Sequence, residues 1–361
     1  MTTEDIISQI PIKKIKRLLD DPQKSAAAVN LVYVSDSQPG ITRLKKGKSF
    51  TYLHKGKRLT DINALQRIQQ LVIPPAWDKV WICVLPKGHL QVTGVDVRNR
   101  KQYKYHTLWN ALRNHTKFYR LYQFGLALCN TRLHLEKDLA LQGLPLRKVL
   151  ATAVDLMEQT NIRIGNNAYA KMYGSYGITT LKDRHVTFTG NEIRFAFKGK
   201  KGVFHNISLK SKRLAAIVKK CKDIPGKELF QFYDNDGKRH PIDSGMVNDY
   251  IREISGGDFT AKDFRTWAGT VQALLAFKHL GFSETITETR KNIVAALDIV
   301  SGLLGNTRTV CKKYYVHPAI ISLYESKELE TYIGELDVME KNAGITGFRV
   351  EEKVLMKILK Q

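Results

Sequence analysis

The sequence predicts an α+β protein, with a small N-terminal antiparallel β-sheet domain followed by a larger, mainly α-helical domain that contains β-hairpins. Short runs rich in β-branched and aromatic residues, separated by turn residues, occupy positions 31–106. Longer segments with apolar residues at helical spacing follow, and a period-two pattern interrupts them at residues 185–209. We therefore expect two domains, residues 1–110 and 111–361. The change from strand-like to helix-like pattern falls near residues 107–118.

The first domain is expected to contain several short strands and one helix. The segments with strand composition are LVYVSD, SFTYLHKGKRL, KVWICVL and HLQVTGVDV. Turns between them are predicted at Gln38-Pro39-Gly40, Lys55-Gly56-Lys57 and Pro86-Lys87-Gly88. The helix is predicted over residues 61–71, where apolar side chains recur at helical spacing at Ile62, Leu65, Ile68 and Leu71.

Helices dominate the expected second domain. One begins in TLWNALRNHTKFYRLYQFGLAL, and another is predicted over residues 146–170, with one apolar face made by Leu150, Ala153, Val154 and Met157. Residues 185–209 indicate two hairpins, with turns at Thr189-Gly190-Asn191 and from Gly199 to Gly202. The chain after about residue 210 is expected to be mostly helix.

The charge of the chain indicates a polyanionic partner. The sequence has 58 basic against 34 acidic residues, a formal net charge of +24. Such an excess disfavours compaction unless a polyanion is the usual neighbour, which favours nucleic acid. An anionic membrane surface is the alternative, but the sequence has no apolar run of bilayer length and no lipidation motif. The N-terminus lacks the apolar core of a secretory signal, so we expect a cytoplasmic, nucleoid-associated protein and no membrane.

No metal or cofactor is expected from the sequence. The cysteines Cys83, Cys129, Cys221 and Cys311 are far apart and form no C-x-x-C pair, which favours neither a zinc site nor a disulfide framework. The chain also has no carboxylate-rich metal motif and no P-loop for a nucleotide.

Five polar residues of the second domain match the chemical needs of phosphodiester transfer: Arg163, Lys200, Arg265, Asn306 and Tyr315. A phosphodiester under attack places negative charge on two non-bridging oxygens, expels an alkoxide that needs a proton, and requires an attacking oxygen. Two guanidinium groups, an amide, an ammonium group and a phenol meet these needs without a metal.

The two arginines lie in contexts suited to binding an anion. Arg163 follows the apolar stripe of the predicted 146–170 helix and stands just before Gly165, which weakens further helix. Arg265 is expected just before an apolar helix, whose positive N-terminus would favour an anion. Each has a plainer alternative, an interface ion pair for Arg163 and an ion pair with Asp263 for Arg265.

Lys200 is predicted at the tip of a hairpin, because period-two apolar runs flank Gly199-Lys200-Lys201-Gly202. A hairpin tip can reach into a DNA groove, where the ammonium would protonate a departing 5′ oxygen. The alternative is a solvated turn lysine that neutralises backbone phosphate. Lys201 is the nearest competitor for the acid role.

Asn306 and Tyr315 complete the set. Gly305 is expected to end the preceding helix, so Asn306 either caps the next helix or donates its amide to a phosphate oxygen. A buried helical face is expected at Val310, Tyr314, His317 and Ile321. Tyr315 would lie about 100° off that face, so we expect it, rather than Tyr314, to be the nucleophile.

In order, spacing and local context, these residues resemble the poxvirus-type type IB DNA topoisomerases, including their bacterial branch. The similar segments of the first domain are Ile73 to Trp77, Val80 to Cys83, Gly88 to Gln91 and Arg100 to His106. Those of the second are Ile162 to Gly165, Phe197 to Gly202, Lys262 to Thr266 and Lys312 to Tyr315. The resemblance covers nearly the whole chain and implies a fold of the tyrosine recombinase and topoisomerase IB type.

The resemblance implies a role for each residue. Arg163 and Arg265 would bind the scissile phosphate, Lys200 would be the general acid and Tyr315 the nucleophile. Asn306 stands where poxvirus members carry a histidine, and because an asparagine does not titrate, a general-base role there is not expected. The implied DNA contacts are Arg98, Arg100, Lys101, Gln102, Tyr103, Lys104, Tyr105, Tyr169, Lys201 and Lys262.

The basic and aromatic residues from Arg98 to Tyr105 suit contacts to phosphates and base edges. Strand alternation places Tyr103 and Tyr105 on one face. Gln102 would point the opposite way in a regular strand, so its base contact requires a bend or a helix start there.

The expected activity is relaxation of supercoiled duplex DNA by transient cleavage of one strand through a 3′-phosphotyrosyl intermediate, without ATP. We expect a monomer whose two lobes clamp double-stranded DNA, with residues 107–120 as hinge. A tyrosine recombinase is one alternative, although such enzymes typically carry a histidine where this chain has Lys262, and a helical N-terminal domain. A non-catalytic basic DNA-binding protein is the other.

Overall fold

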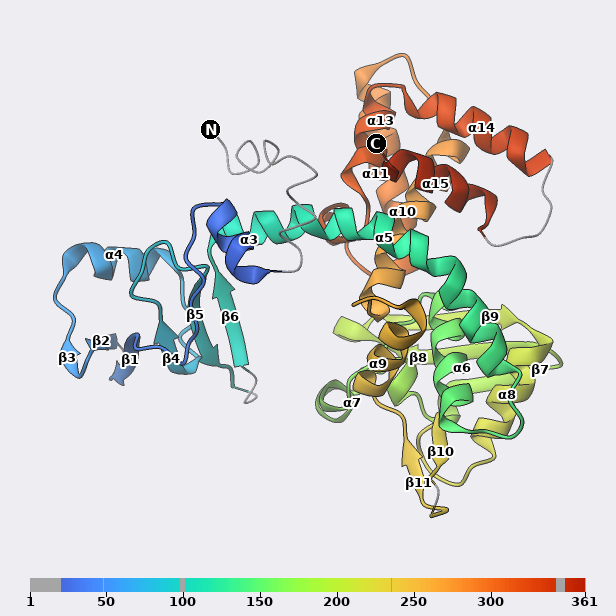
Figure 1. Cartoon of the computed structure of the whole chain (residues 1–361), viewed down its shortest axis with the longest axis horizontal. Coiled ribbons are helices and arrows are strands. Elements are labelled where there is room, and N and C mark those ends of the chain that lie inside the picture. Colours follow the sequence, from blue (N-terminus) through green and yellow to red (C-terminus); the bar gives the residue numbers. More distant parts are fainter. Residues whose placement is uncertain (1–20, 48, 98–100, 235, 342–347, 361) are drawn as a thin grey trace. The chain divides into compact units, whose positions relative to one another are not determined.

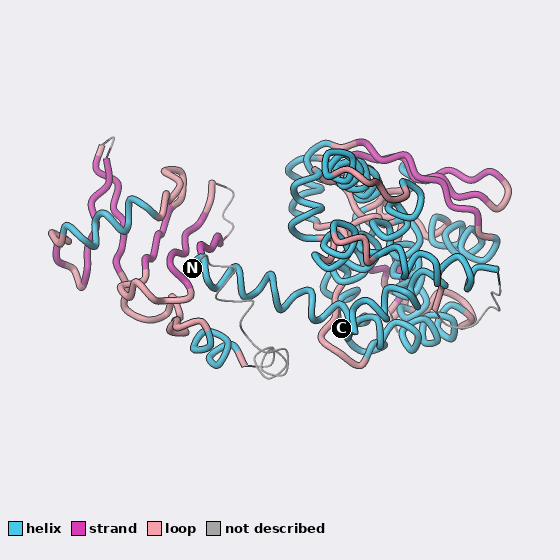
Figure 2. Tube along the Cα trace, turned by 90° about the horizontal axis from the view of Figure 1, so that it is seen from above, coloured by secondary structure: helices cyan, strands magenta, loops and turns pink. Residues whose placement is uncertain are grey.

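Two units divide the chain, residues Met1–Tyr119 and Arg120–Gln361. The computed structural model (Figures 1 and 2) describes residues 21–47, 49–97, 101–234, 236–341 and 348–360. An antiparallel sheet forms most of the first unit, and the second is mainly helical with two smaller sheets (Figure 1). The predicted fold class is therefore confirmed.

Six strands in the order β3-β2-β1-β4-β5-β6 form the sheet of the first unit, and all neighbours are antiparallel. They are β1 (Ile41–Lys46), β2 (Ser49–His54), β3 (Lys57–Arg58), β4 (Asp78–Ile82), β5 (Leu90–Val95) and β6 (Lys101–Tyr105). The predicted turn between β2 and β3 forms at Lys55 and Gly56, both with positive φ. Strand β6 lies at an edge of the sheet, so among the described strands one of its sides has no neighbour.

Two helices cover apolar residues of this unit. Helix α4 (Ile62–Gln70) begins where Asp61 accepts a hydrogen bond from the Asn63 N–H, and it buries Ile68 against the sheet. Helix α3 (Pro22–Ala28) buries Ala26 in a separate small cluster. The helix predicted over residues 61–71 is thus confirmed.

The segment LVYVSD does not form the predicted strand. Its only ladder contact with another described residue is an isolated parallel bridge between Val32 and Gly88. Leu31 and Val34 are nevertheless buried, each in a small apolar cluster. Its apolar residues therefore reflect packing of a connecting segment rather than a ladder.

A single 33-residue helix, α5 (Thr107–Leu139), begins in the first unit and continues into the second. In the second unit, the predicted hairpins form the three-stranded sheet β7 (Val186–Thr189), β8 (Glu192–Lys198) and β9 (Phe204–Lys210). Helices α6 (Leu146–Thr160) and α8 (Lys212–Lys222) pack on its apolar face (Figure 1). A further hairpin, β10 (Gln231–Tyr233) with β11 (Arg239–Pro241), was not expected from the sequence.

The remaining helices of the second unit are α7 (Asn167–Tyr173), α9 (Ser244–Ser255), α10 (Ala261–Leu280), α11 (Ile286–Leu304), α12 (Arg308–Tyr314), α13 (Pro318–Glu325), α14 (Leu329–Lys341) and α15 (Val350–Lys360). One apolar core joins these helices, apart from α7, to the buried face of the three-stranded sheet. In Figure 2 this unit is mostly helix, with strands along one edge. Over the described residues, no single helix has the length and hydropathy to span a bilayer; α11 and α12 together would, but they meet at 92°.

Two expectations about helix ends were wrong. The helix predicted over residues 146–170 ends at Thr160, because Asn161 adopts the left-handed conformation (φ 57°), and α7 is a separate helix. The single helix assumed through residues 310–321 breaks between α12 and α13, since Pro318 disfavours helix in the residue before it. Of the assumed face only Ile321 is buried, and its other three residues are partly buried, whereas Cys311 and Val316 are fully buried.

Candidate active site

Four of the five predicted residues meet where several helices end. Arg163 follows the end of α6, and Arg265 lies in the first turns of α10. Asn306 comes directly after Gly305, the left-handed C-cap of α11. Tyr315 is the C-cap of α12. Arg265 lies inside the helix rather than before it as expected, because α10 begins four residues earlier, after the N-cap Thr260.

The backbone around Arg163 is held by a neighbouring segment. The carbonyl of Arg163 accepts a hydrogen bond from the Ile178 N–H at 2.8 Å, and that of Ile164 accepts one from the Thr179 N–H at 2.8 Å. Gly177 lies so close to the Arg163 carbonyl that a Cβ there would clash. This pairing holds Arg163 in place although it is in neither a helix nor a strand.

Both guanidinium groups bind carbonyl oxygens at helix C-termini. Arg163 donates to the Gly305 carbonyl at 3.1 Å and to Oδ1 of Asn306 at 2.6 Å. Arg265 donates to the carbonyls of Leu304, at 2.7 Å, and Asn161. The last carbonyls of a helix lack partners within the helix and carry the negative end of its dipole, so they attract cations. Within the described residues no carboxylate contacts either guanidinium group, so neither charge is neutralised by an ion pair.

This arrangement leaves two cations close together in a buried place. Burial lowers the pKa of Arg163, and the nearby Tyr315 and Cys311 oppose that shift. Burial, followed by repulsion from Arg163, lowers the pKa of Arg265, which is only 7% exposed. An arginine starts from so high a pKa that both groups remain charged at neutral pH. A bound anion would therefore relieve both the desolvation and the repulsion.

Two buried donors at this site lack a partner among the described residues, Nε of Arg265 and Nδ2 of Asn306. Because Oδ1 of Asn306 accepts from Arg163, its NH₂ group must be directed elsewhere. Leaving a buried donor unpaired costs about 1–3 kcal/mol, so unpaired donors are rare without a functional reason. These donors match the non-bridging oxygens of a phosphodiester.

Tyr315 lies beside Arg265, whose Cζ is 5.4 Å from the centroid of the tyrosine ring. Its backbone packs against α10: the Thr270 hydroxyl contacts the Tyr315 carbonyl at 3.2 Å, and a Cβ on Gly269 would lie 2.7 Å from that carbonyl. The ring of Tyr314 instead has Lys313 at 5.5 Å from its centroid. Arg265 therefore lies beside the ring of Tyr315, whereas a lysine lies beside that of Tyr314.

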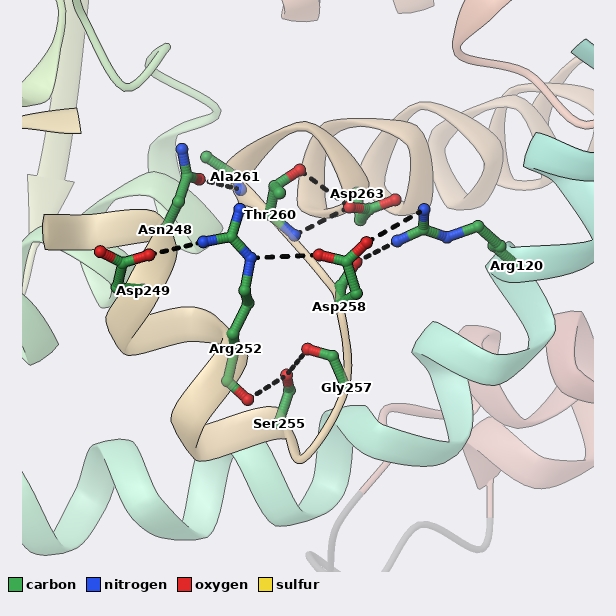
Figure 3. A network of polar contacts seen from close by, with 10 residues as sticks. All are labelled: Arg120, Asn248, Asp249, Arg252, Ser255, Gly257, Asp258, Thr260, Ala261 and Asp263. Carbon is green, nitrogen blue, oxygen red and sulfur yellow. Dashed lines mark hydrogen bonds and ion pairs between the residues drawn. The ribbon is translucent and has the colours of Figure 1, made fainter. Parts of the chain in front are cut away.

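Ionic contacts hold the loop between α9 and α10 (Figure 3). The Asp258 carboxylate lies 3.1 Å from Nε of Arg252 and 3.9 Å from a guanidinium nitrogen of Arg120 on α5. Arg120 also donates to the Asp258 carbonyl. The loop that leads to Arg265 is thereby tied to α5 and α9.

A capping box starts α10 just after this loop (Figure 3). The Asp263 carboxylate accepts from the Thr260 N–H at 2.8 Å and from its hydroxyl at 2.9 Å. Asp263 is therefore used in capping, and the alternative of an ion pair with Arg265 is not observed. The position of the first helical residue determines the direction in which each later side chain points. These contacts therefore help to orient Arg265 toward the site.

Lys200 lies in a short 3₁₀ turn, Lys200–Gly202, between β8 and β9, so its predicted hairpin position is confirmed. The turn is closed by hydrogen bonds from the Gly199 N–H to the Val203 carbonyl, at 2.7 Å, and from the Gly202 N–H to the Gly199 carbonyl, at 3.1 Å. The Lys200 side chain is exposed, and no polar contact joins it to the other four residues within the described structure.

Comparison with known proteins decides the family. Residues 102–340, more than half of the chain, match the family described as eukaryotic DNA topoisomerase I, catalytic core. Residues 49–96 match the bacterial DNA topoisomerase IB N-terminal domain. The chain belongs to the type IB DNA topoisomerases. The expected topoisomerase activity on DNA is thereby confirmed.

Viral type IB topoisomerases are similar over most of their length. The DNA topoisomerase 1B of Acanthamoeba polyphaga mimivirus is 31% identical over 295 residues, covering 80% of this chain and 88% of the viral protein. The DNA topoisomerase I of monkeypox virus and the DNA topoisomerase 1B of vaccinia virus (strain Copenhagen) are each 24% identical over 309 residues. These two matches cover 82% of this chain and 92% of the viral proteins.

In the first unit of this type IB topoisomerase, β6 carries most of the predicted DNA-binding residues. Tyr103 and Tyr105 stack with ring centroids 6.0 Å apart, so their expected common face is confirmed. Lys101 lies on the same face, 5.6 Å from the Tyr103 ring centroid, and forms an ion pair with Asp36 at 2.6 Å. Tyr103 remains 47% exposed.

The polar side chains on the other face of β6 form hydrogen bonds to groups of the same unit. Gln102 donates to Asp96 at 2.9 Å, and the Lys104 ammonium donates to the Leu71 carbonyl at 2.7 Å. No bend turns Gln102 toward the tyrosines, so a base contact from it would require exchange of its bond to Asp96. Arg98 and Arg100, also predicted to bind DNA, lie outside the described residues.

The three remaining predicted contacts of this type IB topoisomerase lie in the second unit. Tyr169 lies on α7, with its ring centroid 5.7 Å from that of Tyr173. Lys201 is exposed beside Lys200, with positive φ (61°). Lys262 is exposed in the first turn of α10, three residues before Arg265.

Three residues that contact the candidate site were not predicted from the sequence: Gly269, Thr270 and His205. Gly269 and Thr270 follow Arg265 by about one helical turn. Their contact with Tyr315 could not be predicted from that spacing, because it depends on which segment packs against the helix. His205 lies on the inner face of β9. The period-two pattern of the predicted hairpin already placed a histidine on the face of Ile207 and Leu209, which was the available signal.

Proposed function

We propose that Arg163, Arg265, Asn306 and Tyr315 form the strand-cleavage site of this topoisomerase. One observation supports this most strongly: two buried guanidinium groups, held by carbonyls rather than carboxylates, stand beside a tyrosine. The unpaired nitrogens Nε of Arg265 and Nδ2 of Asn306 add two donors. Donors that are preorganised around a phosphate stabilise the charge that grows on its oxygens during attack.

In the proposed reaction, Oη of Tyr315 forms a bond to the phosphorus of one DNA strand, and the bond from phosphorus to the 5′ oxygen breaks. The phenolic proton passes to solvent water, because no carboxylate or histidine is assigned as base. The arginines favour the phenolate during attack. A 3′-phosphotyrosyl enzyme and a free 5′-hydroxyl result, and attack by that hydroxyl restores the strand. The phosphotyrosine retains the bond energy, so ATP is not consumed.

Lys200 is the proposed general acid. Its ammonium gives a proton to the departing 5′ oxygen, which would otherwise leave as a poor alkoxide, and recovers that proton on religation. Its exposed turn position suits a group that meets DNA only in the complex. Lys201 is the competitor for this role. Its backbone has a positive φ and that of Lys200 does not, so the two side chains point in different directions.

We also propose that residues 1–110 form a DNA-clamping domain and residues 111–361 the catalytic domain. Tyr103, Tyr105 and the basic residues around them would contact the duplex, together with Tyr169, Lys201 and Lys262. The net charge of +24 supports binding to a polyanion. The enzyme is proposed to act as a monomer on the nucleoid in the cytoplasm, with no metal requirement and with residues 107–120, which lie in the continuous helix α5, as hinge.

The test is to trap the covalent adduct and map the modified peptide. Supercoiled plasmid and enzyme are incubated in EDTA and stopped with detergent, and the DNA-linked peptide is sequenced after proteolysis. We expect relaxation in EDTA and a single adduct, on Tyr315. Tyr315→Phe should form no adduct yet retain salt-dependent binding, because binding arises mainly from phosphate contacts.

Tyr314→Phe is the matched control and should relax DNA normally. An adduct on Tyr314, or relaxation by Tyr315→Phe, would refute the assignment of the nucleophile. Relaxation that stops in EDTA would refute the metal-independent mechanism.

A further inference from the structure

The imidazole of His205 lies between two glycines that come from different parts of the second unit. A Cβ on Gly199 would be 2.5 Å from Cδ2 and 2.6 Å from Nε2 of His205. A Cβ on Gly305 would be 2.7 Å from Cε1 and 3.3 Å from Nε2 of the same ring. Neither position has room for a side chain while the histidine is there. The ring therefore contacts both backbones directly.

The two glycines adjoin the two parts of the proposed catalytic machinery. Gly199 immediately precedes Lys200 and closes its turn through both backbone hydrogen bonds of that turn. Gly305 immediately precedes Asn306, and its carbonyl binds Arg163 at 3.1 Å. His205 thus connects the turn that carries the general acid to the groups that bind the phosphate.

The surroundings of His205 restrict how its ring can lie. On β9 it pairs with Phe197 of β8, and the two rings stack with centroids 5.2 Å apart and planes 23° apart. Burial lowers the pKa of His205, and the cations Arg163 and Arg265 lower it further, so the ring is neutral at neutral pH. A neutral ring adds no third positive charge beside the two arginines.

We propose that His205 is a positioning residue that sets the distance between the Lys200 turn and the phosphate site, so that the ammonium reaches the departing 5′ oxygen. The inference rests on the proposed acid role of Lys200. His205 touches the reacting atoms in no step. Its loss would let the turn move relative to Asn306 and Arg163, and a displacement of about 1 Å can cost roughly 10²-fold in rate.

A change of leaving group tests this idea. In a suicide oligonucleotide whose 5′-bridging oxygen at the cleavage site is replaced by sulfur, the thiolate leaves without a proton. The general acid then contributes little. Single-turnover cleavage of the oxygen and sulfur substrates is compared for wild type, Lys200→Ala, His205→Ala and the more conservative His205→Gln. His240→Ala is the matched control, because that histidine is exposed on β11 and paired with Asp234.

With oxygen, His205→Ala should cleave about 10²-fold more slowly than wild type, and His205→Gln should show a smaller loss. With sulfur, both variants should come within about threefold of wild type, as should Lys200→Ala. His240→Ala should match wild type with both substrates. A structural defect in the phosphate site would slow both substrates equally.

Each other outcome separates the two ideas. If sulfur restores Lys200→Ala but leaves both His205 variants slow, His205 does not act through Lys200 and the inference fails alone. If sulfur does not restore Lys200→Ala, the acid role of Lys200 fails and the inference fails with it. Should His205→Ala not fold, judged by its thermal unfolding, His205→Gln decides: normal cleavage of the oxygen substrate by that variant overturns the inference.

Discussion

Thr270 on α10 holds the backbone of Tyr315. Its hydroxyl lies 3.2 Å from the Tyr315 carbonyl and 2.8 Å from the Thr266 carbonyl, and it accepts a hydrogen bond from the His317 N–H at 3.2 Å. Thr270 is fully buried. The helix that presents Arg265 therefore also fixes, about one turn later, the chain segment that carries the proposed nucleophile.

Removing this hydroxyl should slow cleavage without weakening DNA binding. In Thr270→Val, a methyl group replaces the hydroxyl at similar volume and removes its contacts to the Tyr315 carbonyl and the His317 N–H. We expect single-turnover cleavage to be about 10- to 100-fold slower, because the phenol is less well aligned. Thr270→Ser retains the hydroxyl and should retain most of the rate. A loss in Thr270→Ser with none in Thr270→Val would mean that packing of the methyl group, not the hydrogen bond, positions Tyr315.

Arg265 should not tolerate lysine. Arg265→Lys keeps one positive charge, but an ammonium cannot bind the carbonyls of Asn161 and Leu304 while also presenting a donor to the phosphate. We expect cleavage to fall about 10²- to 10³-fold, as for loss of a transition-state donor. Arg213→Lys, at an exposed ion pair with Glu136, is the control and should be unaffected. Near-normal cleavage by Arg265→Lys would show that charge alone suffices.

Asn306 offers a test of the unpaired donor. Asn306→Asp keeps the acceptor for Arg163 but replaces the Nδ2 donor by a negative oxygen facing the phosphate site. Cleavage should fall about 10²- to 10³-fold. Asn306→His, which restores a donor and matches the residue expected in poxvirus members, should stay within about tenfold of wild type. If Asn306→Asp cleaves DNA as fast as wild type, the amide does not contact the phosphate.

A buried ionic network should contribute strongly to stability. Glu352 of α15 is 2% exposed and accepts hydrogen bonds from Arg132 at 2.7 and 2.8 Å and from Nε1 of Trp267 at 3.0 Å. Burial alone would raise the pKa of Glu352, but its bonds to Arg132 and Trp267 lower it overall. Glu352→Gln should lower the free energy of unfolding by about 3 kcal/mol, measured by urea unfolding. Glu330→Gln, exposed on α14, should change it little; an equal loss there would contradict the role of the network.

His185 should make stability depend on pH. Burial, followed by the cations Arg184 and Lys182, lowers the pKa of His185 to about 4 in the folded protein. An unfolded histidine titrates near pH 6.5, so between these values only the unfolded chain binds the proton, and stability falls as the pH drops from 6.5 toward 4. Between pH 7 and pH 5 this group should remove about 1–2 kcal/mol.

The variant His185→Asn tests that slope. Its Oδ1 can replace Nδ1 as acceptor for the Lys182 N–H, which lies 3.1 Å from Nδ1 in the native protein. Urea unfolding at pH 7 and pH 5 should show a smaller loss on acidification than in wild type. His279→Asn, at an exposed position, is the control. An unchanged slope in His185→Asn would mean that other groups cause the acid sensitivity.

The sequence by itself determined those features that depend on near neighbours. Period-two alternation and turn residues located the hairpins of the second unit, because strand alternation and tight turns are properties of a few adjacent residues. Helical spacing likewise located α4. It failed at Pro318, where the apolar pattern continues through a break, and at the segment from Leu31, where packing occurs without a ladder. The chemical types of the five predicted site residues could also be recognised from the sequence.

Only the tertiary structure decided how those residues meet. Arg163 binds a residue 143 positions away, and Arg265 binds one 104 positions away, so no local periodicity could encode either contact. Thr307, not Asn306, caps α12, which leaves the Asn306 amide for Arg163. The arginines keep their charge available because helix C-termini, rather than carboxylates, hold them, and that depends on where two distant helices end.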